Sequence, residues 1–200
     1  MIIFLKNIDN QGFTLLELMV TVAIAAILVT IAVPSFTQTI RSNRLTATNN
    51  MFLASLNLAR SEAIKRNTLV SVSPTDGANW RNGWDVFTDV NSNGILEAAA
   101  PNNDVLIKTY QAVPINYTLT GTVPVANSIT YQASGIGFAG SFVLCDNFDF
   151  DNVPQANTSR MIIVSPTGRA MTAGDADNDG IPNKNDAANT EIISCTIAPF

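Results

Sequence analysis

The first feature of the sequence is a long apolar stretch near its start. Residues 13–33 read FTLLELMVTVAIAAILVTIAV, and Glu17 is their only charged residue. As a helix this stretch is about 31 Å long, which matches the hydrocarbon thickness of a bilayer. The pattern predicts a membrane-spanning helix. Its single carboxylate costs roughly 2–3 kcal/mol or more in apolar surroundings unless a partner compensates it.

The helix is expected to continue beyond the apolar stretch. Pro34 follows that stretch, but residues 35–67 contain neither glycine nor proline. Apolar residues recur there at helical spacings, so one face should be apolar. We therefore expect a span or filament-core helix at 13–34 and an amphipathic helix at 35–67. The residues of the apolar face are Phe36, Ile40, Leu45, Phe52, Leu56, Ala59 and Ala63.

After residue 67 the pattern changes to short runs rich in β-branched and aromatic residues. Clusters of Gly, Pro, Asn and Asp separate these runs, as between antiparallel strands. A long helix followed only by strands predicts an α+β fold, in which an antiparallel β-sheet domain at 68–200 covers the apolar face of the helix. The predicted strands are 69–73, 84–88, 105–110, 115–119, 129–131, 142–145, 161–165 and 191–197.

Composition excludes several classes of function. Eleven Lys and Arg against sixteen Asp and Glu give a net charge of −5, which argues against attraction of nucleic acid or anionic lipid over the whole surface. The chain has no histidine, which excludes Ser-His-Asp and Cys-His nucleophiles and every zinc site that contains histidine. We expect a protein that binds other molecules rather than an enzyme.

The residues around the start of the apolar stretch form a specific signature. The sequence from Gly12 to Leu18, GFTLLEL, resembles the class III signal of type IV prepilins and pseudopilins. The resemblance implies that residues 1–12 are a leader, that prepilin peptidase cuts after Gly12, and that the new amine of Phe13 is methylated. Glu17 would then lie fifth in the mature chain, one helical turn from a terminal ammonium that can compensate it. The alternative is an ordinary signal anchor with an isolated glutamate.

Three further segments resemble the GspH/FimT family of minor pilins and pseudopilins. They are a hairpin at 82–94 (NGWDVFTDVNSNG), a helical segment at 58–66 and the turn SPTGR at 165–169. The resemblance implies the pilin fold and a minor pilin that helps to initiate a type IV pilus, at or near its tip. It also implies other pilins as partners and a single-pass protein of the inner membrane with a periplasmic domain. A GspH-type pseudopilin of a type II secretion system is the alternative.

The hairpin has two interpretations. Trp84 and Phe87 are expected in the core, while Asp89, Asn91, Asn93 and Gly94 shape a reversal through side-chain bonds to the backbone. Oxygen donors at alternate positions would also suit a cation, but Ala100 stands where a closing carboxylate is needed. We interpret the segment as a turn.

Some FimT-like members bind DNA through a C-terminal Gly-Arg-x-Arg motif. The matching residues here are Gly168, Arg169, Ala170 and Met171, so the second arginine is missing. Arg169 and Arg160 are the candidates for phosphate contacts, but DNA binding is not favoured, because an acidic loop lies nearby in the sequence.

Cys145 and Cys195 are the only cysteines. In a domain exported to an oxidising compartment they are expected to form a disulfide that holds the C-terminal segment. Two buried free thiols, or a metal site with two thiolates, remain alternatives.

Residues 175–186 read DADNDGIPNKND and carry the clearest candidate site. Carboxylates at loop positions 1, 3, 5 and 12 and glycine at position 6 are typical of a Ca²⁺ loop. The segment resembles the calcium loops of thrombospondin type 3 repeats and OmpA-like proteins. An acidic turn held by its own hydrogen bonds is the alternative. The predicted ligands are Asp175, Asp177, Asp179, the carbonyl of Ile181, Asn183 and Asp186.

Overall fold

The computed structural model describes residues 12–149, 151–184 and 191–196 and divides the chain into two compact units, Met1–Ile40 and Arg41–Phe200. A single helix, α1 (Leu15–Arg66), contributes to both units. The two predicted helical segments are therefore one continuous element, and Pro34 lies within it.

Local sequence explains both ends of α1. Thr14 precedes the first turn and its hydroxyl accepts a hydrogen bond from the Glu17 N–H at 3.2 Å, as an N-cap residue does. At the other end Asn67 has a left-handed backbone with φ of 52°, and the Thr68 N–H donates to the Ala63 carbonyl at 3.2 Å. This is the Schellman arrangement, in which residues just past a helix satisfy its last carbonyls.

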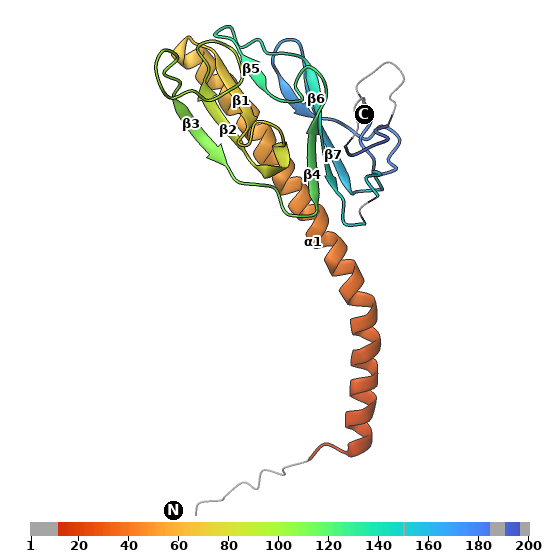
Figure 1. Cartoon of the computed structure of the whole chain (residues 1–200). Coiled ribbons are helices and arrows are strands. Elements are labelled where there is room, and N and C mark those ends of the chain that lie inside the picture. The colour runs from red at the N-terminus through yellow and green to blue at the C-terminus, as the bar shows by residue number, and fades with distance from the viewer. Residues whose placement is uncertain (1–11, 150, 185–190, 197–200) are drawn as a thin grey trace, which may run out of the picture. The chain divides into compact units, whose positions relative to one another are not determined.

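The strands found in the described part of the second unit form two antiparallel sheets rather than one (Figure 1). Sheet A has the order β3-β2-β1-β5 and sheet B the order β4-β6-β7-β8. The η1 turn (Trp80–Asn82) lies between β1 and β2 in the sequence. The strands are β1 (Val70–Pro74), β2 (Trp84–Thr88), β3 (Leu106–Tyr110), β4 (Tyr117–Gly121), β5 (Ile129–Tyr131), β6 (Gly140–Asp146), β7 (Ser159–Val164) and β8 (Ala170–Thr172).

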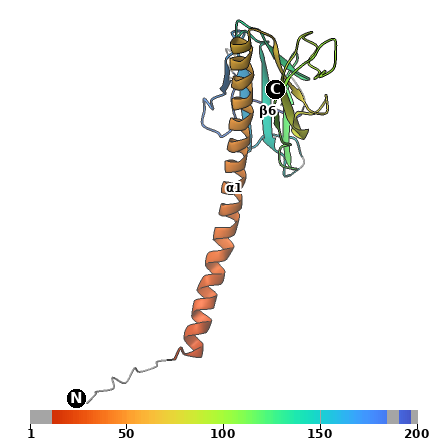
Figure 2. The same ribbon diagram turned by 90° about the vertical axis from the view of Figure 1, so that its left-hand side faces the viewer.

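The main core lies where the later part of α1 meets both sheets. Figure 2 shows this part of the helix alongside β6. Phe52 is at its centre, with ring centroids 5.0 Å from Trp84 and 4.7 Å from Phe142. Removing a buried aromatic ring of this kind costs about 3–5 kcal/mol. The predicted apolar face is confirmed from Leu45 onward, whereas Phe36 and Ile40 are exposed.

A second, smaller core covers the other face of sheet B. Val143, Cys145 and Met161 pack there against Ile192 and Cys195. The predicted strand 191–197 is wrong as far as residues 191–196 are described, because only an isolated bridge joins Glu191 to Asn183. This segment lies against the sheet face and forms no edge strand. The three-residue β8 was not predicted.

Candidate functional site

The N-terminal signature lies at an exposed helix start. Gly12 and Phe13 precede α1, Phe13 is 76% exposed, and Glu17 lies in the first turn. Within residues 12–149, 151–184 and 191–196, no group forms a hydrogen bond or ion pair with the Glu17 carboxylate. The structure thus presents a carboxylate without a partner among exposed apolar side chains.

The first part of α1 suits apolar surroundings in its remaining details. Among the described residues, α1 is the one helix long and apolar enough to cross a membrane. Its most apolar 18 residues have a mean hydropathy of 2.5, and none of them is buried. Two threonines of this first part satisfy their hydroxyls within the helix: Thr21 donates to the Leu18 carbonyl and Thr30 to the Ile27 carbonyl. These bonds lower the cost of polar groups in an apolar medium.

The hairpin between β2 and β3 is a hydrogen-bonded turn, as predicted. The buried Asp89 carboxylate accepts hydrogen bonds from the backbone N–H groups of Asn93 (3.1 Å) and Gly94 (2.9 Å) and from the Ser71 hydroxyl. Gly94 has φ of 72°, which favours glycine. Trp84 and Phe87 are fully buried, as expected.

Two carboxylates that the sequence analysis did not identify complete this loop. Glu97 accepts hydrogen bonds from the side-chain amides of Asn91, Asn93 and Asn102 at 2.6–2.9 Å. Asp104 accepts from the backbone N–H groups of Val90 and Glu97. The several asparagines near Glu97 in the sequence could have indicated that this carboxylate accepts hydrogen bonds from their side chains.

The predicted disulfide between Cys145 and Cys195 is confirmed. It joins β6 to the segment that covers sheet B. The Thr118 and Thr120 hydroxyls donate to the Cys195 carbonyl at 3.4 and 3.2 Å, and the Cys195 N–H donates to the Asn152 carbonyl at 2.9 Å. Several independent contacts therefore fix this segment.

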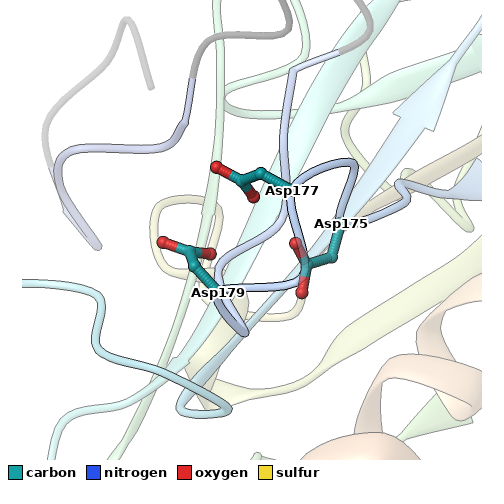
Figure 3. Close-up of side chains that lie close together, drawn as sticks. All are labelled: Asp175, Asp177 and Asp179. Carbon is teal, nitrogen blue, oxygen red and sulfur yellow. The ribbon is translucent and has the colours of Figure 1, made fainter.

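The acidic loop follows β8. Asp175, Asp177 and Asp179 are exposed and project from one loop (Figure 3), and one carboxylate oxygen from each lies within 4.8 Å of the others. The Asp175 oxygens accept from the Asn178 and Gly180 N–H groups at 2.8 Å. The loop thus holds three carboxylates close together.

The other predicted ligands differ in what they contact. Asp179 accepts a hydrogen bond from the Ile181 N–H at 2.7 Å, and the Asn183 side-chain oxygen accepts one from the Ala176 N–H. Asp186 lies outside the described residues. Asn183 therefore uses its side-chain oxygen within the loop.

Sequence spacing did not identify Glu191 as a neighbour of this loop. The negative charge of Asp179 raises the pKa of Glu191, and burial, Asp177 and Asp175 raise it further. For Asp175, burial would raise the pKa, but hydrogen bonds from the backbone N–H groups of Gly180 and Asn178 outweigh burial and lower it. Like charges held together in this way are the electrostatic condition that a cation relieves.

The structure does not bring the two candidate DNA-binding arginines together. Arg160 is half-buried and its guanidinium donates to Ser42 and Thr46 of α1 and to the Ser159 carbonyl, and burial lowers its pKa. Arg169 is exposed in the turn after β7. The length of β7 separates the two residues by about 16 Å along the sheet.

Arg60 organises the turn that carries Arg169. It donates to the Gly135 carbonyl at 2.8 Å and the Thr167 carbonyl at 3.2 Å. Gly168 has φ of 76°, and a Cβ atom there would lie 2.2 Å from the Gly135 carbonyl oxygen. The helical segment 58–66 and the turn 165–169, predicted as separate motifs, therefore meet through Arg60.

A long helix packed on antiparallel sheets, headed by an exposed apolar segment, defines the pilin type of subunit. The family model described as type II transport protein GspH matches residues 48–168, more than half of the chain, and the prokaryotic N-terminal methylation motif matches residues 8–33. The chain therefore belongs to the GspH family, that of GspH/FimT-type minor pilins and pseudopilins. These are structural proteins, so the chain is not an enzyme.

Two solved structures illustrate the likeness. The type IV minor pilin FimU of Pseudomonas aeruginosa is 18% identical with a TM-score of 0.53, and the match covers 76% of this chain and 96% of that one. The minor pseudopilin EpsH from the Type 2 Secretion System of Vibrio cholerae is 11% identical with a TM-score of 0.45, covering 67% and 99%. A comparison with curated proteins gave no match. The likeness to FimU supports the fold.

Proposed function

We propose that this chain is a minor pilin that helps to start assembly of a type IV pilus, at or near its tip. The carrying observation is the Glu17 carboxylate, which has no partner among the described residues and stands in the first turn of an exposed apolar helix. Prepilin peptidase would cut after Gly12 and methylate Phe13, and the span would hold the chain in the inner membrane with its α+β domain in the periplasm.

The physical basis is the cost of a lone charge. A carboxylate in apolar surroundings costs about 2–3 kcal/mol or more, and the terminal ammonium of a neighbouring subunit offsets this cost when the helices pack in a filament. Glu17 therefore favours the assembled state over the isolated membrane-bound chain. In an ordinary signal anchor with an isolated glutamate, the carboxylate would not favour assembly over the isolated chain.

The test replaces Glu17 by Val and follows three quantities in cells: leader cleavage, chain level and incorporation into sheared pili. We expect cleavage to remain near the wild-type level and incorporation to fall at least about tenfold. Thr21→Val is the matched control, since the Thr21 hydroxyl bonds only within the helix at 2.9 Å. Normal incorporation of Glu17→Val would contradict the proposal.

The second candidate is a pseudopilin of a type II secretion system. The description of the matching family model favours it. Deleting the gene should then abolish secretion of the exported enzymes and leave piliation intact, whereas the pilus proposal predicts the reverse. Scoring both phenotypes in one deletion strain separates the candidates.

We also propose that loop 175–186 binds Ca²⁺ as a structural ion. Its donors are all oxygens, which suit a hard cation, and each carboxylate oxygen that accepts one N–H keeps a second lone-pair site. Glu191 could supply a further oxygen from the segment that covers sheet B. Millimolar Ca²⁺ would be sufficient for an exported domain.

Calorimetric titration of the full chain in detergent with Ca²⁺ tests this proposal. We expect Asp177→Asn to lose Ca²⁺ binding. Asp151→Asn, in another exposed turn, is the control and should keep it.

DNA binding has weaker support, because Arg160 is held against α1 and Arg169 alone is exposed. A salt-dependent gel shift that Arg169→Ala abolishes would support it. A gel shift that Arg169→Ala leaves unchanged would exclude this assignment.

A further inference from the structure

The four edge strands of the two sheets differ in how they are protected from pairing with another strand. The edges of sheet A are β3 and β5, and those of sheet B are β4 and β8. β5 and β8 have three residues each, and β3 carries Lys108. Short length and lysine are the usual protections of an edge. β4, with the sequence YTLTG, has five residues and no charge.

The pairing of β4 with β6 shows which backbone groups face away from the sheet. The Asn147 N–H donates to the Asn116 carbonyl and the Thr122 N–H donates to the Ser141 carbonyl. Hydrogen-bonded pairs alternate along an antiparallel ladder, so Thr118 and Thr120 also face β6. The N–H and C=O of Leu119 then point to the free edge, and no group in the described parts of the chain bonds to them.

These groups face a groove of about 420 Å³ between β4 and η1. Leu119 is only 5% exposed, and its two backbone groups are unpaired within the described residues. Unpaired buried backbone groups are costly, and an added strand satisfies both at once. An incoming segment of three extended residues is about 10 Å long, so it is short enough to pair alongside the five-residue β4.

The lining of the groove indicates the chemistry of the incoming segment. Among the described residues that line it, Arg81 is the only charged one. Arg81 is exposed and donates a hydrogen bond of 2.9 Å to the Ile115 carbonyl. Trp80 is 2% exposed and its indole N–H is bonded to Ala126, so it offers no ring face on which a sugar could stack. A peptide with an acidic side chain opposite Arg81 is the better match.

We propose that the groove between η1 and β4 receives an extended acidic segment of a neighbouring pilin-type subunit, which pairs with the free edge of β4. The identity of the donor rests on the proposed function, whereas the pairing rests on the Leu119 groups and Arg81. Gly121 packs against Val125, since an added Cβ would lie 2.6 Å from the Val125 carbonyl oxygen, and this contact limits one end of the groove.

The experiment places a photoreactive phenylalanine analogue at Asn127, an exposed lining residue, in the full chain expressed in its own cells. The same analogue at Gln111, just after the protected edge β3, is the matched control. Cross-linked peptides are sequenced by mass spectrometry. We expect position 127 to yield at least about five times more adduct than position 111, on an acidic segment of another pilin subunit.

Two substitutions test the same groove without disturbing the core. Ala78→Trp narrows the groove, and Thr75→Trp, outside it in the same exposed turn, is its control. Arg81→Glu reverses the charge and Arg81→Lys keeps it. Ala78→Trp and Arg81→Glu should each lower the adduct at least about fivefold, with the melting temperature in detergent showing that each chain is folded. Should Ala78→Trp unfold the chain, Arg81→Glu still decides.

Three results would overturn the inference: no adduct at position 127, an adduct only with residues 197–200 of the same chain, or an adduct only with a second copy. Co-purification of the chain with sheared pili is measured in the same cells. Normal co-purification without the groove adduct would contradict the inference and leave the proposed function standing. If the wild-type chain does not co-purify with sheared pili, the proposed function is contradicted as well.

Discussion

Two loops of the domain share one spacing of oxygen-bearing residues and differ in charge. Residues 89–94 read DVNSNG and residues 175–180 read DADNDG, so the first loop carries amides where the second carries carboxylates. In the first, the amide hydrogens of Asn91 and Asn93 are bonded to Glu97. In the second, no side-chain amide of the described residues bonds to Asp177 or Asp179, and both carboxylates raise the pKa of Glu191. The comparison shows that the two loops differ in charge rather than in spacing: the first satisfies its carboxylates with its own donors, and the second holds three exposed carboxylates close together.

The largest effect is expected at the buried end of the first loop. Asp89→Ala leaves the Gly94 N–H without an acceptor and removes one of two partners from both the Asn93 N–H and the Ser71 hydroxyl. It should lower the free energy of unfolding by about 3 kcal/mol. Urea denaturation of the full chain in detergent measures this. Asp175→Ala, without calcium, should change stability far less because Asp175 is exposed. Equal losses would contradict the comparison.

Converting the first loop to the charge of the second should come next. Asn91→Asp with Asn93→Asp removes two donors from Glu97 and adds two like charges, and should cost about 2 kcal/mol without calcium. Calcium should restore part of the loss if the spacing alone can build a site. If the loss of stability is the same with and without calcium, the first loop cannot bind the ion, because Ala100 stands where a closing carboxylate is needed.

A smaller effect is expected when Ca²⁺ is added to the wild-type chain. At ten times the dissociation constant a ligand that binds only the folded state adds about 1.4 kcal/mol of stability. The Asp89→Ala chain should gain the same amount, since its change lies in the other loop. Melting curves with CaCl₂ against MgCl₂ measure the gain, and an equal gain from Mg²⁺ would indicate a general ionic effect.

The smallest effect is expected at Glu191 without calcium. Its pKa is raised in the folded chain by Asp179, burial and Asp177, so the ionised group opposes folding, and that penalty appears as pH rises above its ordinary range. Glu191→Gln should therefore raise the melting temperature slightly at pH 7. The difference from wild type should vanish below pH 4.5, the ordinary pKa of the group. A difference that persists there would have another cause.

Periodicity was sufficient for the parts of the fold that are local or strongly apolar. It located α1 and the buried residues Leu45, Phe52 and Leu56, and the turn residues located the hairpin at Asp89. It did not show that the strands divide into two sheets, since the sheet to which a strand belongs depends on pairing between distant residues. The short β8 also depends on such pairing, with β7.

The candidate sites divide in the same way. The acidic loop and both cysteines were recognisable from residue type and spacing. Glu191 was mistaken for part of a strand, because only the packing of its segment on sheet B brings it to the loop. The clamp formed by Arg60 depends in the same way on two turns more than seventy residues away in the sequence.

The disulfide sets an order on maturation of the domain. Cys195 follows Cys145 by 50 residues, so during synthesis the outward face of sheet B stays uncovered until the chain beyond β8 has emerged. In a molecule whose two cysteines are still reduced, no covalent bond holds this segment over Val143 and Met161. The cross-link therefore records whether a given molecule has been delivered to an oxidising compartment.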